Sequence, residues 1–134
     1  MESEASEIAE FEIALQHNAE WEARWIHFDG NNPACSSPSP YFRHEFSCGK
    51  EIAKARLYVT ARGLFEARIN GKRIGNDYFV PGWTDFSQQI QYMSYDITGS
   101  LKSGNNTIGA ILGDGWYCGY LSGRRRNLYG AYPE

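Results

Sequence analysis

The sequence has few of the residues that bind metals or form disulfides. Its three cysteines are Cys35, Cys48 and Cys118, an odd number with no CxxC spacing, and its three histidines are scattered without HxH or HxxxH pairing. A disulfide framework needs paired cysteines, and a zinc site needs clustered Cys and His ligands. We therefore expect reduced cysteines, no metal site built on these residues, and no cofactor held by them.

Long apolar runs are also absent. No stretch approaches the ~20 apolar residues that a membrane span needs. The acidic start, MESEASEIAEFEIAL, lacks the basic and apolar regions of a signal peptide. These absences predict a protein with no membrane partner and, together with reduced cysteines, they favour a cytoplasmic location.

Positive charge is scarce as well. The 134 residues include 13 Lys and Arg against 16 Asp and Glu, which gives a formal net charge of −3. Nucleic-acid-binding domains usually carry an excess of basic residues. The short run Arg124–Arg126 in an acidic chain therefore does not indicate a nucleic-acid-binding surface. The nearby GDGWYCG has the wrong spacing for a phosphate-binding loop, and no helix pattern follows it. We expect no nucleic-acid partner.

What the sequence has instead is a series of short strand-like runs. They lie at 20–28, 41–48, 54–61, 64–69, 89–97 and 106–115, and Asn70-Gly71 is a strong signal for a tight hairpin after 64–69. With the return arm of that hairpin, the chain has roughly seven strands. No helical pattern exceeds about two turns, except at 1–18, where helix and strand spacing fit equally. The pattern predicts an all-β antiparallel sandwich at 41–134, after a strand and linker region at 1–40.

Three single residues have predicted local roles. Asp85 is expected to cap backbone N–H groups of a turn, and Asp96 to cap a helical turn around Leu101. Trp83 is expected to anchor the core or the contact between the sheets, with a sugar platform as the alternative.

Two longer strings resemble a known family. GLFEARINGKRIGNDYFVPGWTDFSQQIQYMSYDIT at 63–98 and SLKSGNNTIGAILGDGWYCG at 100–119 are similar to the bacterial α-L-rhamnosidase N-terminal domain. WEARWI at 21–26 also resembles the tryptophan-rich opening of such enzymes. The similarity runs through the Asn70-Gly71-Lys72 hairpin to the Gly113–Tyr117 string, and it spans residues 21–130.

This resemblance implies a jelly-roll, galactose-binding-like sandwich that precedes a catalytic (α/α)6 barrel. In the family the catalytic carboxylates lie in that barrel. The chain stops at Glu134, so we expect the barrel and the last strands of the sandwich to be missing from it. The implied partners are the catalytic and other domains of the parent enzyme. The unpaired sheet edge is one that a second copy could cover.

The best candidate for a binding site is the stretch 113–130. Sugars stack their C–H faces on aromatic rings and exchange hydrogen bonds with planar polar groups. The candidate carbohydrate-binding residues are Asp114, Trp116, Tyr117, Arg124, Asn127 and Tyr129. In the alternative interpretation, Trp116 and Tyr117 fill the core and the arginines pair with acids of further domains. The resemblance also implies a calcium-binding site that uses Asp114 or Asn127, although the sequence has no EF-hand spacing.

Three functions are compatible with these observations. The first is a non-catalytic accessory module of an α-L-rhamnosidase, inactive alone, that supports the barrel and contacts rhamnose-containing glycans. The second is an autonomous lectin-like module. The third is a complete small hydrolase with Asp114 and Glu66 as its carboxylate pair, since glycoside hydrolysis needs two carboxyl groups.

Overall fold

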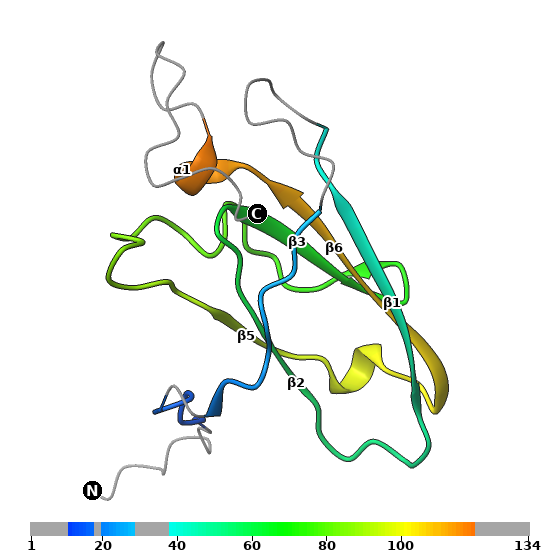
Figure 1. Ribbon diagram of the computed structural model, residues 1–134. Helices are drawn as coiled ribbons and strands as arrows, with labels where there is room; N and C mark the ends of the chain where they lie inside the picture. The colour runs from blue at the N-terminus through cyan, green and yellow to red at the C-terminus, as the bar shows by residue number, and fades with distance from the viewer. Residues whose placement is uncertain (1–10, 18–19, 29–37, 120–134) are drawn as a thin grey trace, which may run out of the picture.

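The computed structural model describes residues 11–17, 20–28 and 38–119, and it is built almost entirely of strands (Figure 1). Sheet A has the order β1-β6-β3-β4, with β1 at Tyr41–Cys48, β6 at Gly104–Gly113, β3 at Leu64–Ile69 and β4 at Lys72–Arg73. Sheet B pairs β2, Arg56–Val59, with β5, Met93–Asp96. All strand pairs are antiparallel, so the predicted all-β antiparallel sandwich is confirmed.

β6 is the central strand of sheet A. It pairs with β1 from Gly104 to Ile111 and with β3 from Ile108 to Gly113. Figure 1 shows β1, β6 and β3 running side by side, with β2 and β5 as a separate layer. Among the described residues, no helix is long and apolar enough to cross a membrane.

The core lies between the two sheets and follows from the alternation of β3. Phe65, Ala67 and Ile69 are buried, while the residues between them are only partly buried. Because successive strand side chains point to opposite faces, one face of β3 enters the core. The residues of sheet B that pack against this cluster are Leu57, Val59, Met93 and Tyr95.

The hairpin between β3 and β4 has the predicted turn. Asn70 has φ 51° and Gly71 has φ 82°, which is the pair of positive φ angles that a tight type I′ hairpin requires. The Asn70 side chain also reaches the start of β6: its Nδ2 donates to Asn106 Oδ1 at 2.9 Å, and its Oδ1 accepts from Thr107 N at 3.0 Å. The turn is therefore joined to the central strand.

Asn106 is the one buried polar residue in the described part of the chain. Its Oδ1 accepts from Lys102 N at 3.0 Å, and its Nδ2 donates to Lys102 O at 2.7 Å and Gly104 O at 3.0 Å. We call Asn70 and Asn106 the asparagine clasp. It satisfies backbone groups in the turn between the short helix at Thr98–Ser100 and β6.

Two predicted elements differ from the structure. The segment 20–28 is described but contains no strand, because its backbone joins no ladder among the described residues. The described chain therefore has six strands rather than seven, and the run 89–97 contributes only the four residues of β5. The predicted helical turn is a 3₁₀ turn at Thr98–Ser100 that ends before Leu101, and its N-cap is Ile97 rather than Asp96. Asp96 Oδ1 still accepts from Thr98 N at 2.9 Å, two residues further along the chain.

The N-terminal residues 11–17 and 20–28 lie across sheet B (Figure 1). Glu12 forms ion pairs with Lys54 and Arg56. The hydrogen bond from Lys54, with the charges of both cations, holds the pKa of Glu12 below its ordinary value. Leu15 N donates to the hydroxyl of Tyr92 at 3.0 Å, and the Trp21 ring lies 5.7 Å from the Tyr92 ring. These contacts place residues 21–28 beside β2 and over sheet A (Figure 1).

Candidate functional site

The most prominent surface feature is a pair of stacked tryptophans. Trp116 lies in α1, the single helical turn Gly115–Cys118 that follows β6. Its ring stacks on that of Trp83 with centroids 5.5 Å apart and planes inclined by 14°. Trp83 is 57% exposed, so its predicted role as a core anchor is wrong. The ring instead packs on α1, and this leaves a flat aromatic surface facing solvent.

Tyr117, the next residue of α1, packs inward. Its ring meets the buried Phe86 edge-on, with centroids 5.5 Å apart and an interplanar angle of 88°. Both Trp116 and Tyr117 are half-buried, so neither fills the space between the sheets as the alternative interpretation expected. We call Trp83, Phe86, Trp116 and Tyr117 the aromatic cluster.

A hydrogen-bonded turn holds the loop that carries Trp83. Asp85 Oδ1 accepts from Ser87 N at 3.1 Å and from Ser87 Oγ at 2.6 Å. These two bonds keep the pKa of Asp85 below its ordinary value. The Asp85 carbonyl accepts from Gln88 N and Gln89 N, both at 2.9 Å. The predicted capping role of Asp85 is confirmed, and it fixes the chain just after Trp83.

Two glycines let the start of β3 approach α1 closely. A Cβ at Gly63 would lie 2.5 Å from Gly113 O, and a Cβ at Gly115 would lie 2.8 Å from a Leu64 side-chain carbon. Both glycines also have positive φ, 153° and 58°. This contact brings Arg62 next to Tyr117, with Arg62 Cζ 5.5 Å from the centre of the tyrosine ring.

Replacing Gly63 by alanine is expected to lower the free energy of unfolding by about 1–3 kcal/mol, because the backbone conformation and the contact with Gly113 O both disfavour a side chain. Urea denaturation measures the change. Gly49→Ala is the matched control, because a Cβ there meets no atom within 4 Å. Equal stability of the two variants would contradict the close approach.

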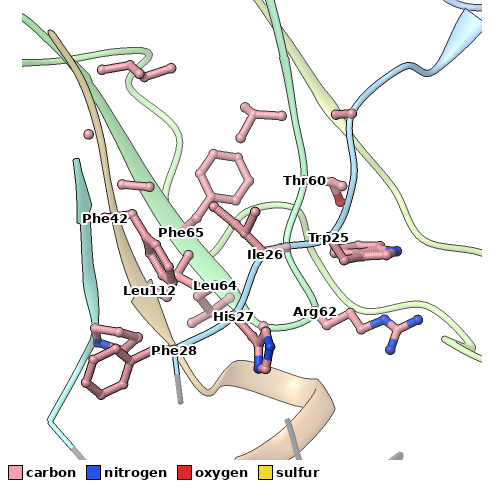
Figure 2. A pocket seen from close by; sticks show the side chains of 18 of the residues that line it. Trp25, Ile26, His27, Phe28, Phe42, Thr60, Arg62, Leu64, Phe65 and Leu112 are labelled. Atoms are coloured by element: carbon pink, nitrogen blue, oxygen red, sulfur yellow. The ribbon is translucent and has the colours of Figure 1, made fainter. Parts of the chain in front are cut away.

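A second feature is an apolar groove between residues 21–28, β2 and the inner face of sheet A, with a volume of about 570 Å³. Figure 2 shows Ile26 pointing into it from the N-terminal segment toward Phe65, while the ring of Phe28 lies at its lower edge. Ile26 and Phe28 nevertheless remain exposed over more than half of their surface. The segment 21–28 therefore covers the groove only in part.

Arg62 and Trp25 form one rim of this groove. Arg62 Cζ lies 4.9 Å from the centre of the Trp25 ring. Figure 2 shows the guanidinium beside that ring and turned away from the apolar interior. Sequence reasoning missed both residues as site candidates, because Arg62 falls between the strand-like runs 54–61 and 64–69 and Trp25 was assigned to a strand face.

The hydrolase alternative required Glu66 and Asp114 to act as a carboxylate pair. Glu66 lies in β3, where its Oε1 accepts from Arg68 Nε at 2.7 Å and its Oε2 lies 3.6 Å from Arg73 Nε. Both oxygens thus contact arginines, which is the arrangement of a structural ion pair. Asp114 directly precedes α1.

Of the six predicted site residues, the structure places three together. Asp114, Trp116 and Tyr117 lie at and within α1. Arg124, Asn127 and Tyr129 lie outside the described residues, and their roles stay predictions. Within the described ranges, no group of three or more His, Cys, Asp or Glu side chains could hold a metal ion.

The comparisons with known proteins all find similarity to alpha-L-rhamnosidases. The model of the alpha-L-rhamnosidase N-terminal domain matches residues 50–134. An alpha-L-rhamnosidase of Alteromonas sp. (strain LOR) is 40% identical over 142 residues, which covers 98% of this chain and 15% of the relative.

Solved structures agree with the sequence comparison. The crystal structure of native α-L-rhamnosidase from Aspergillus terreus matches 80% of this chain with a TM-score of 0.68 and 41% identity, over 12% of its own length. That of Streptomyces avermitilis α-L-rhamnosidase complexed with L-rhamnose matches 60% of this chain with a TM-score of 0.57 and 46% identity, over 8% of its own length. The chain thus spans about a seventh or less of these proteins.

Proposed function

Because the chain belongs to the alpha-L-rhamnosidase N-terminal domain family, we propose that it is a non-catalytic accessory domain of an alpha-L-rhamnosidase. In this role it supports the catalytic part of the parent enzyme and contacts rhamnose-containing carbohydrate. The length comparison supports an accessory role, since the chain corresponds to a small part of each relative. The arginine contacts of Glu66 also favour a structural role over a catalytic one.

The stacked tryptophan pair carries the proposal of sugar contact. The exposed Trp83 ring lies parallel to Trp116, and the hydrogen-bonded turn at Asp85 holds the loop behind it. A rigid, exposed ring can pack on the apolar face of a sugar with little loss of side-chain freedom. Asp114 lies two residues before Trp116, at the start of α1.

Replacing Trp83 by alanine is expected to weaken binding of L-rhamnose by about tenfold or more, equivalent to about 1.4 kcal/mol, because the sugar loses its packing surface. Trp116→Ala is expected to have a similar effect, since it removes the support of the Trp83 ring. Isothermal titration of the chain with L-rhamnose, with and without calcium, measures both changes.

Tyr41→Ala is the matched control for this experiment. Tyr41 is an exposed aromatic residue on β1, in a different sheet element from the tryptophan pair. Its loss is expected to leave the affinity unchanged. If the unmodified chain shows no binding at millimolar L-rhamnose, the proposed sugar contact is wrong.

A further inference from the structure

Arg62 differs from most arginines in the described part of the chain. Each of four others forms an ion pair with a carboxylate; these are Arg43, Arg56, Arg68 and Arg73. Arg62 forms no ion pair with a described residue, and its Nε is buried without a hydrogen-bond partner there. Arg24, the remaining one, is exposed and contacts no ring. Among the residues that the structure describes, Arg62 is therefore a positive charge held in place without a paired carboxylate.

Two aromatic rings hold this guanidinium in place. Arg62 Cζ lies over the Trp25 ring at 4.9 Å and over the Tyr117 ring at 5.5 Å. Such contacts fix the plane of the guanidinium and leave the N–H groups along its edge for other partners. An arginine edge presents two parallel donors, and this spacing matches the two oxygens of a carboxylate.

The surroundings indicate what kind of carboxylate fits. Trp25 is 51% exposed, so an apolar surface lies directly beside the arginine edge. An acidic sugar carries both complementary groups in one ring: a carboxylate for Arg62 and C–H groups for the part of the Trp25 indole that the guanidinium leaves exposed. An aspartate or glutamate side chain would satisfy the arginine but leave the indole surface uncovered.

We propose that Arg62 and Trp25 bind the carboxylate-bearing ring of an acidic saccharide, a uronic acid unit. This inference rests on the proposed function, because it takes the partner of this surface to be a glycan. It adds a second contact point, on the groove rim, to the one at the tryptophan pair. A glycan that carries both neutral and acidic units could then contact the two points together.

The test compares two ligands that differ only in the carboxylate. The whole chain is titrated with methyl β-D-glucuronide and with methyl β-D-glucoside in low salt, by isothermal titration calorimetry. We expect the glucuronide to bind at least tenfold more tightly than the glucoside and to weaken as salt is added, because an exposed charge pair is screened. Equal affinity for the two ligands would overturn the proposal.

Variants assign the binding to this site. Arg62→Gln is expected to remove the preference for the glucuronide, and Trp25→Ala to weaken the glucuronide and the glucoside together. Arg43→Gln is the matched control, since Arg43 is exposed and already paired with Glu45. If Arg62→Gln lowers the thermal unfolding midpoint, Arg62→Lys serves instead, since lysine keeps the charge over the rings but lacks the paired donors. Retention of the full preference in that variant overturns the proposal.

Two further ligands separate this inference from the proposed function. Binding of L-rhamnose without any preference for the glucuronide overturns the acidic site alone and leaves the tryptophan contact intact. Acetate that binds as tightly as the glucuronide, with no effect of Trp25→Ala, shows a site for any carboxylate and also overturns the proposal. A preference for the glucuronide that disappears only in the Arg62 and Trp25 variants supports it.

Discussion

Replacing Ile69 by alanine is expected to lower the free energy of unfolding by about 2–5 kcal/mol. Ile69 is only 1% exposed and lies in the core cluster with Phe65, Ala67 and Ile97. Removing three buried carbon atoms loses their transfer free energy and leaves a cavity that the two sheets can close only in part. Small domains have a total stability of about 5–15 kcal/mol, so this variant should be close to unfolding at moderate urea.

Ile13→Ala is the matched control for the core. Ile13 is 68% exposed in the N-terminal segment, and the same atoms are removed there without opening a cavity. We expect its urea midpoint to stay close to that of the unmodified chain. If Ile69→Ala is no less stable than Ile13→Ala, Ile69 does not lie in the core.

Replacing Asn106 by leucine is expected to cost about 3 kcal/mol or more in the free energy of unfolding. Asn106 is 2% exposed, and its side-chain amide bonds to Lys102 N, Lys102 O and Gly104 O. A leucine side chain cannot make these three hydrogen bonds. These three backbone groups are part-buried, so the loss of each partner is expected to cost about 1 kcal/mol, the lower end of the range for buried groups. The side chain of Asn70 loses its bond to Asn106 but keeps those to Ser100 O and Thr107 N. Thermal and urea unfolding both report the change.

The neighbouring Asn105→Leu serves as the control for this variant. Asn105 is exposed on β6 opposite Ser47, and its side chain makes no hydrogen bond to a described residue. A change within about 0.5 kcal/mol is expected there. Similar stability of the two leucine variants would mean that water replaces the clasp at no cost.

The features that the sequence predicted well depend on local chemistry. Asn70-Gly71 specifies its own turn because few residue pairs accept two positive φ angles. Asp85 and Asp96 bond to backbone groups two residues away, and the alternation of β3 sorts its side chains between core and surface. Each of these outcomes is decided within a few residues, so the sequence pattern is sufficient to predict it.

The features that were missed depend on distant partners. Trp83 has the composition of a core anchor, and only the position of α1 decides that its ring stacks at the surface. Trp25 and Arg62 meet because the N-terminal segment crosses the sandwich, which no local pattern indicates. The same segment is extended but has no ladder partner among the described residues, so its alternation looked like a strand.

The position of β6 has a consequence for the order in which the chain is made. β6 is the last strand of sheet A to leave the ribosome, yet it lies between β1 and β3 and pairs with both. At about 5–20 residues per second, β1 is made several seconds before β6, the one strand with which it pairs in the described part of the chain. During that time β3 is paired only with the two-residue β4. The open strand edges can pair wrongly with other nascent chains. Rapid dilution or a chaperone that shields these edges should therefore raise the yield of folded protein.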